Sequence, residues 1–189
     1  VCLPIVVGIA LMSLNQARFQ VPTEFGHTYL SNGQLQRIKD YGLFNVHFVS
    51  RNLASMFALV PQFLPEEPYI RISKHGLALW FTTPALLFLL APRYPTARPR
   101  RNLVVAATVA LVCVAVPHVF YQNTGWVQFG YRFSMDYVVY LTLLLALSRR
   151  RVSTPLRIAI VASVLINAFG AITFGQAPQF YANWILEAG

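Results

Sequence analysis

Two short arginine-rich segments, each directly after an apolar run, constrain this chain more than any other feature of its sequence. They span residues 92–102 and 148–157, and neither contains an acidic residue. Their arginines are Arg93, Arg98, Arg100 and Arg101 in the first segment and Arg149, Arg150, Arg151 and Arg157 in the second. Apolar spans that alternate with short basic loops are typical of multi-pass membrane proteins, and the basic loops stay in the cytoplasm. The pattern therefore predicts a polytopic membrane protein with both arginine-rich loops on the cytoplasmic side.

The composition agrees with a chain that faces lipid. Of its 189 residues, 56% are hydrophobic and only 11% are charged, whereas soluble domains carry about 25% charged residues. The formal net charge of +9 would also suit a nucleic-acid-binding protein, but over half of the basic residues lie in the two loops. We therefore expect no nucleic-acid partner and assign the basic residues to membrane lipid, whose inner leaflet is anionic.

Apolar stretches predict an all-α, polytopic membrane helix bundle of about five spans. The stretches are 1–14, 76–91, 103–121, 134–147 and 156–174. The first is too short to cross a bilayer unless it begins upstream, because a helical span needs about 20 residues. We therefore expect a fragment whose missing N-terminal half belongs to the same protein. The predicted parts are the end of a truncated helix at 1–14, an outer loop at 15–75, a four-span bundle at 76–174 and an outer tail at 175–189.

The alternation of spans and loops predicts the plasma (inner) membrane, with the long loop and the C-terminus outside. Within the loop, Asn32 and Gly33 indicate a turn, and residues 34–41 predict a short polar helix. Residues 44–59 carry aromatic and aliphatic side chains at helical spacing. They predict an amphipathic helix, either on the membrane surface or reentrant.

The most unusual patch is the aromatic-rich segment 121–137 between the third and fourth spans. In it, Arg132 and Asp136 are four residues apart, so on an α-helix they would share a face and could pair. One interpretation is a structural ion pair in an interfacial aromatic belt. In the other, the planar guanidinium of Arg132 grips a phosphate and Asp136 orients it.

A second patch, residues 15–29, follows the first apolar stretch directly. Arg18, Glu24 and His27 offer a cation, a carboxylate and an imidazole beside aromatic residues. Such a set suits a sugar or a polar headgroup. A hydrophilic exit loop with an interfacial anchor is an equal alternative.

Other chemistry-bearing residues give no recognised site. None of the four histidines has the close spacing of zinc ligands, so no metal is assigned within this chain. His118 follows Pro117, and we expect it to bond a neighbouring backbone group at a helix kink. Glu66 and Glu67 stand between prolines, which favours a solvated turn over an acid/base pair.

Three segments resemble the C-terminal half of bacterial polytopic glycosyltransferases of the GT-C fold. Residues 15–26 read Asn-Gln-Ala-Arg-Phe-Gln-Val-Pro-Thr-Glu-Phe-Gly. This is similar to an Asn-x-x-Arg-Phe-Gly-x-Pro-x-Glu-Phe-Gly pattern of such proteins, with Gln20 in place of glycine. Residues 75–84 contain Gly76 and end in Thr-Thr-Pro, and residues 123–137 contain Gln-Phe-Gly-Tyr-Arg-Phe-Ser-Met-Asp.

The resemblance implies inverting transfer of a sugar from a polyprenyl-phosphate donor to an acceptor on the outer face. Such enzymes commonly use an acidic residue of their first outer loop as the base, sometimes with a divalent metal. That loop belongs to the missing half, so we assign no catalytic residue here and expect no cofactor in this fragment. The residues that the resemblance places in the substrate or phosphate site are Arg132, Asp136, Arg18, Glu24, His27 and Gln128.

Two other functions remain open. A transporter or flippase would use helices broken near the midplane, although no two segments form a matched repeat. The candidate positions for such breaks are Pro84, Pro117, Asn167 and Gly170. A non-enzymatic membrane subunit would pack a partner against small residues such as Gly170 and Ala171.

Overall fold

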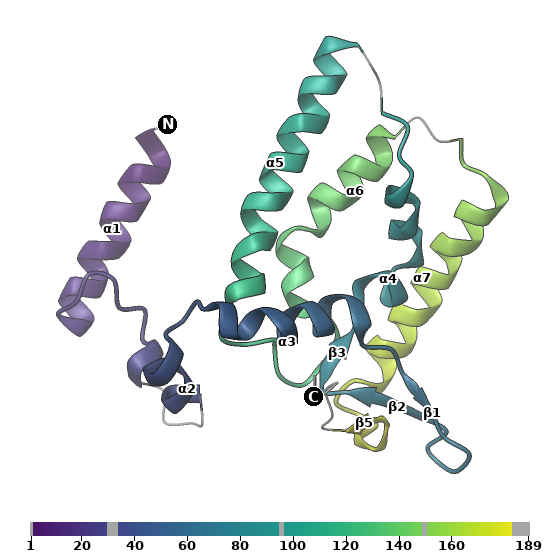
Figure 1. Cartoon of the computed structure of the whole chain (residues 1–189), viewed down its shortest axis with the longest axis horizontal. Helices are drawn as coiled ribbons and strands as arrows, with labels where there is room; N and C mark the ends of the chain where they lie inside the picture. The colour runs from purple at the N-terminus through teal and green to yellow at the C-terminus, as the bar shows by residue number, and fades with distance from the viewer. Residues whose placement is uncertain (1, 30–33, 95–96, 149–150, 183–189) are drawn as a thin grey trace. The chain divides into compact units, whose positions relative to one another are not determined.

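The computed structural model describes residues 2–29, 34–94, 97–148 and 151–182. The chain forms two compact units, Val1–Leu43 and Phe44–Gly189, which are described separately (Figure 1). The predicted turn at Asn32-Gly33 and two of the loop arginines, Arg149 and Arg150, lie outside the described residues.

The first unit consists of one apolar helix and a short polar part. Its elements are α1 (Cys2–Phe19), the 3-10 helix η1 (His27–Tyr29) and α2 (Gln34–Tyr41). The aliphatic side chains of α1 are exposed, as expected for a helix whose surroundings are lipid. The chain then turns back, since Asn15 Nδ2 donates to Pro22 O over 3.1 Å and the ring of Phe19 stacks on Tyr29. The predicted polar helix at 34–41 is confirmed as α2.

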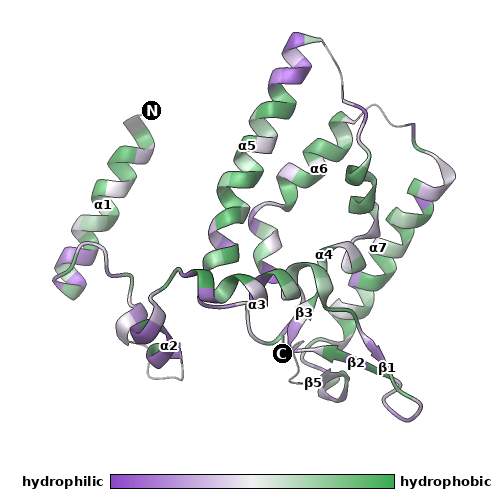
Figure 2. Ribbon diagram, in the orientation of Figure 1, coloured by the Kyte–Doolittle hydropathy of each residue, from purple (hydrophilic) through white to green (hydrophobic). Residues whose placement is uncertain are grey.

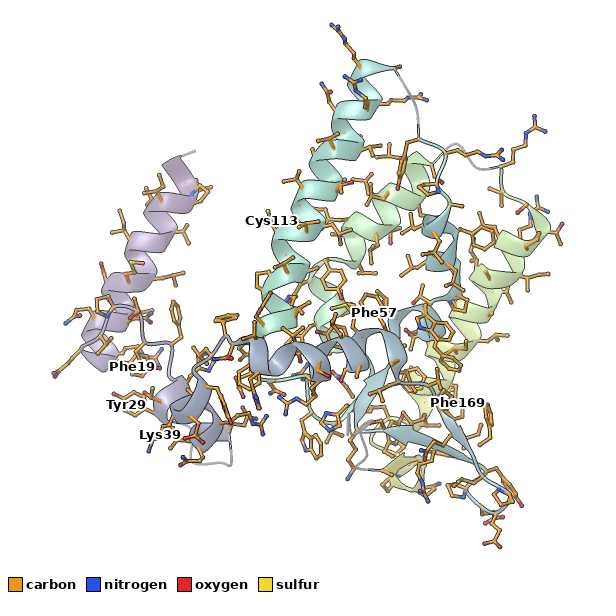
Figure 3. All side chains as sticks on the ribbon, viewed as in Figure 1. Phe19, Tyr29, Lys39, Phe57, Cys113 and Phe169 are labelled. Carbon is orange, nitrogen blue, oxygen red and sulfur yellow. The ribbon has the colours of Figure 1, made fainter. Side chains whose placement is uncertain are left out.

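The second unit is mostly helical, which confirms the coarse fold class. Its long helices are α5 (Arg98–Phe120) and α7 (Thr154–Thr173), and α6 (Val138–Leu147) is shorter. Among the described residues, α5 and α7 are the two helices long and apolar enough to cross a membrane, with mean hydropathies of 2.4 and 1.9. Their apolar side chains project outward, as around Cys113 on α5 (Figure 3).

The helix ends that carry the described arginines lie together in the second unit. The arginine-bearing N-terminus of α5, the C-terminus of α6 and the N-terminus of α7 lie at one end of the unit (Figure 1). The hydrophilic colouring at the starts of α5 and α7 marks the same end (Figure 2). Val104 and Ala107 of α5 pack on Leu144 of α6, which holds the two helices together. The described arginines of both loops therefore belong to one end of the unit, opposite the strands.

The predicted span 76–91 is not a single α-helix, and that expectation is corrected. The segment consists of β3 (His75–Leu77), α4 (Leu79–Thr82) and the 3-10 helix η4 (Pro84–Leu90). Pro84 disfavours helical dihedrals at the preceding residue, and Thr83 has φ −134° and ψ 72°. The helix therefore breaks at Thr83 because Pro84 follows it, and the Thr-Thr-Pro sequence carries this signal.

Short strands at the opposite end were not predicted. β1 (Gln62–Phe63) pairs antiparallel with β2 (Ile70–Ser73), and β2 pairs in parallel with β5 (Tyr181–Ala182). β3 pairs in parallel with β4 (Gln128–Gly130), with His75 opposite Gln128 and Leu77 opposite Gly130. The pairing of β3 with β4 joins the segment that begins at His75 to the loop that follows α5.

The predicted amphipathic helix at 44–59 is helical over most of its length, in three short pieces. It comprises η2 (Val46–Phe48), α3 (Val49–Leu53) and a π-helical turn, η3 (Ala54–Ala58). Phe44 and Phe57 are exposed, whereas Asn52 and Ser55 are fully buried. The buried face also carries Phe48 and Met56, and its Asn52 bonds carbonyls at the end of α5. A position on the membrane surface stays a prediction for the exposed apolar side chains.

Candidate functional site

The C-terminal end of α5 is held by side chains from α3. The last carbonyls of a helix have no partner within the helix. Here Asn52 Nδ2 donates to Val119 O over 2.8 Å and to Tyr121 O over 2.7 Å. Arg51 Nη2 donates to Gln122 O over 2.7 Å. These bonds give the aromatic-rich segment 121–137 a defined starting point.

Gln128 fixes the shape of the loop between α5 and η5 (Arg132–Asp136), a 3-10 helix. It is 4% exposed, and its Nε2 donates to His75 O and to Thr124 O. Its Oε1 accepts a hydrogen bond from the backbone N–H of Arg132 over 3.1 Å. Because the amide is used in this way, its contacts favour a supporting role over the predicted direct contact with substrate.

η5 explains why the predicted pairing of Arg132 with Asp136 is wrong. A 3-10 helix has three residues per turn, so residues three apart share a face and residues four apart do not. Asp136 Oδ2 instead lies 3.1 Å from His118 Nε2. The Arg132 guanidinium lies 5.7 Å from the centre of the Phe133 ring. His118 thus pairs with a side chain, which corrects the expected backbone contact.

Arg132 lines a cavity of about 430 Å³, called here the Arg132 cavity. This volume lies within the range of ligand pockets, about 300 to 1,000 Å³. Residues of α4, β4, η5, α6 and α7 surround it. Its apolar walls include Leu79, Phe129, Val138, Ala171 and Phe174, and its polar lining includes Thr82, Thr83, Ser134 and Arg132.

The polar groups of the Arg132 cavity suit an anion. Ser134 Oγ donates to Tyr131 O over 2.6 Å, so this hydroxyl hydrogen is already used. The guanidinium of the exposed Arg132 carries several N–H donors in a planar fork that matches phosphate oxygens. Among the described residues, Arg132 forms no ion pair with an acidic side chain. A phosphate joined to a hydrocarbon chain matches both this cation and the apolar walls.

Burial also affects a phenol at this cavity. Tyr131 is 2% exposed, and burial raises the pKa of its hydroxyl to about 12. The hydroxyl is therefore neutral at physiological pH and adds no negative charge beside Arg132.

Ser163 and Asn167 of α7 position one wall of the Arg132 cavity. From the sequence, Asn167 is identified only as a candidate helix break, and the pair is not identified. Asn167 Nδ2 donates to Thr82 O over 2.7 Å, at the break after α4, and to Ser163 O over 2.8 Å. Ser163 Oγ accepts from Ala85 N over 3.4 Å. Their spacing of four places them on one face of an otherwise apolar helix, which is the signal that could have found them.

The other predicted site residues lie in the first unit. Glu24 accepts hydrogen bonds from the hydroxyl of Thr28 over 2.9 Å and from its N–H over 3.4 Å. Desolvation alone would raise the pKa of Glu24, but these bonds and those from the backbone of Gly26 and His27 outweigh it and lower the pKa. The Arg18 guanidinium lies 5.2 Å from the centre of the Phe19 ring. In the described part of this unit, no ion pair joins Arg18, Glu24 and His27.

No group of three or more His, Cys, Asp or Glu residues that could hold a metal ion occurs among the described residues. Comparison with known proteins gives no match to any family model, curated protein or solved structure. The geometry of the site therefore stands as the evidence on function.

Proposed function

We propose that this chain is part of an integral glycosyltransferase of the plasma membrane that moves a sugar from a polyprenyl-phosphate donor to an acceptor on the outer face. The observation that supports it most is Arg132 in an apolar-walled cavity of about 430 Å³ beside α6 and α7. A guanidinium beside apolar walls suits the phosphate of a lipid-linked donor, because its planar fork matches phosphate oxygens and the walls match a hydrocarbon chain.

In the proposed reaction, Arg132 binds the phosphate of the donor. When the bond between the sugar carbon and the phosphate oxygen breaks, negative charge builds up on the leaving phosphate. A guanidinium held against that oxygen stabilises this charge through charge-assisted hydrogen bonds. The apolar walls hold the first part of the hydrocarbon chain. The catalytic base is not assigned to any residue of this chain.

The test is transfer from radiolabelled polyprenyl-phosphate sugars by the full-length gene product in membranes. Arg132→Ala should lower the rate by about 100-fold, the usual scale for losing one donor to a developing charge. Arg132→Lys should restore part of it, because it keeps the charge but not the planar fork. Arg101→Ala, an exposed arginine of α5 outside the cavity, is the matched control. Transfer that survives Arg132→Ala unchanged would refute the proposed role.

One observation favours a transporter or flippase as the second candidate. The segment 76–91, which the sequence predicts to be a span, is broken between α4 and η4, and Leu79, Thr82 and Thr83 from it line the Arg132 cavity. Discontinuous helices at a binding site are typical of transporters. Movement of a labelled lipid phosphate across proteoliposomes, without any sugar transfer, would favour this candidate over the enzyme.

The third candidate, a non-enzymatic subunit, receives less support from the helix faces. Gly170, a member of the small-residue face on α7, is buried beneath the ring of Phe129 from the same unit. This part of the face is therefore already occupied within the chain. Co-purification of a stoichiometric partner, with no transfer activity, would favour the subunit.

A further inference from the structure

A second pocket, of about 240 Å³, lies on a different face of η5 from the Arg132 cavity. We call it the His118 pocket, and its lining residues are Phe44, Pro117, His118, Tyr121, Phe133 and Asp136. Since η5 has three residues per turn, Phe133 and Asp136 share the face that lines this pocket. Arg132 and Met135 share the face that lines the Arg132 cavity.

The His118 pocket contains the polar pair His118 and Asp136, and this pair uses only one of the two imidazole nitrogens. His118 Nε2 lies 3.1 Å from Asp136 Oδ2, and Phe133 stacks on the imidazole with ring centres 5.1 Å apart and planes at 14°. The carboxylate and the stacked ring fix the orientation of the imidazole. In the described part of the chain, Nδ1 has no hydrogen-bond partner. With Nε2–H donating to Asp136, Nδ1 remains available for a hydroxyl, as an acceptor in the imidazole and as a donor in the imidazolium.

Aromatic rings form the rest of the pocket. Phe44 and Tyr121 have ring centres 5.5 Å apart at 49°, and Tyr121 meets Phe133 edge-on at 89°. A backbone bond from Asn45 N to Phe120 O, 2.9 Å long, holds the Phe44 side against the end of α5. These links pre-form the pocket. Apolar ring faces beside a few convergent polar groups are the make-up of sites for small polar ligands.

A ring that carries hydroxyls fits this pocket better than a hydrocarbon chain or a cation. A hydrocarbon chain would leave Nδ1 of His118 without a partner. A quaternary cation could meet the ring faces and the Asp136 carboxylate, but it has no hydrogen-bond donor for Nδ1. A sugar satisfies both parts, because its C–H face packs on aromatic rings and its hydroxyls bond the imidazole and the carboxylate.

We propose that the His118 pocket binds the sugar ring of the acceptor, with a ring hydroxyl donating to His118 Nδ1. The assignment of this sugar as the acceptor rests on the function proposed above, whereas binding of a sugar ring does not depend on that function. The separate faces of η5 let the lipid phosphate at Arg132 and the ring at His118 bind together.

The experiment is saturation-transfer NMR on the chain in phosphatidylglycerol nanodiscs with methyl glycosides of mannose, glucose and arabinose. At least one glycoside should bind saturably and shift the imidazole signals of His118, identified by their loss in His118→Asn. Phe133→Leu and Asp136→Asn should weaken binding by about tenfold, equivalent to the loss of one good contact. Phe57→Leu, a change of the same kind at an exposed residue outside the pocket, should leave binding unchanged.

Several results would overturn the proposal. They are no saturable glycoside binding to the wild type, equal binding of cyclohexanol, or preference for choline, which would mark a cation site. Circular dichroism checks that each variant folds, and Tyr121→Leu serves as a second pocket variant if Phe133→Leu does not. Displacement of the glycoside by polyprenyl phosphate would refute the acceptor assignment. Glycoside binding without transfer activity would refute only the proposed function, and transfer without glycoside binding only this inference.

Discussion

Gly170 of α7 gives the ring of Phe129 the space that it occupies. A Cβ built on Gly170 would lie 2.2 Å from Phe129 Cδ1, far inside contact distance. Phe129 also lines the Arg132 cavity and a neighbouring apolar pocket of about 260 Å³. Because Gly170 has no side chain, Phe129 can lie where it forms a wall of both cavities.

Gly170→Ala should destabilise the protein by about 1 to 3 kcal/mol, the usual cost of overpacking. The added methyl group must displace a rigid ring that is packed on Phe169. The free energy of unfolding in mixed micelles measures the effect. Gly8→Ala, also within a helix but with no atom within 4 Å of the new Cβ, is the control and should not destabilise. Equal stabilities for the two variants would contradict the packing described.

Glu24 links the stability of the first unit to pH. Its pKa is lowered from 4.5 in the folded state. The stabilisation is therefore present above pH 4.5 and is lost as the pH falls through the lower folded pKa. Thr28→Val removes one of the hydrogen bonds and should move the pKa of Glu24 upward. NMR titration of the carboxyl carbon measures this shift. Thr23→Val, which removes a hydroxyl in the same loop, should leave the titration unchanged.

Elements are joined mainly through buried amides, and Asn52 is the clearest case. It is fully buried and bonds two carbonyls at the end of α5. Asn52→Ala would leave both carbonyls without this donor, and an unsatisfied buried polar group costs about 1 to 3 kcal/mol.

Asn52→Ala should therefore lower the free energy of unfolding by at least about 1 kcal/mol. It should also speed amide hydrogen exchange in the segment after α5. Asn45→Ala is a suitable comparison, because the bond from the His47 N–H to Asn45 Oδ1 is local and joins residues two positions apart. A variant at Asn52 that exchanges as slowly as the wild type would contradict the role of α3 as a cap for α5.

Element types follow from the sequence where one physical signal dominates. Apolar runs of sufficient length gave α5 and α7, and α2 appeared at its predicted residues. Pro84 signals the break at Thr83 in the sequence, but the apolar residues on both sides of it suggest a continuous span. The strands are two to four residues long. Pairing over so few residues depends on distant segments, which local periodicity does not report.

The site could be predicted by residue type but not by partner. Arg132 and Asp136 stand out from the sequence because charges are rare in this chain. Their separation into two pockets depends on three residues per turn in η5, whereas the prediction assumed an α-helix. The pairing of His118 with Asp136 joins residues 18 positions apart, and no local pattern specifies it.

For the molecule as a whole, the arginine-bearing ends fix a testable orientation. The arginines of α5 lie at its N-terminus, whereas the loop that contains Trp126 follows its C-terminus at Phe120. A membrane-impermeant maleimide should label Trp126→Cys in intact cells, because this residue is predicted to be outside and its side chain is exposed. Ala97→Cys, before α5, should react only after permeabilisation. Both variants need a background without Cys2 and Cys113. The reverse pattern would invert the topology.

The period of η5 has a consequence for how such a protein can vary. Residues 132 and 135 serve one cavity, and residues 133 and 136 serve the other. A substitution at any of these positions therefore changes the lining of one cavity and leaves the lining of the other as it is. Insertion or deletion of a single residue would rotate the residues that follow by a third of a turn and change the linings of both cavities at once. We therefore expect a change of length in these five residues to disturb both cavities, whereas a point substitution disturbs one.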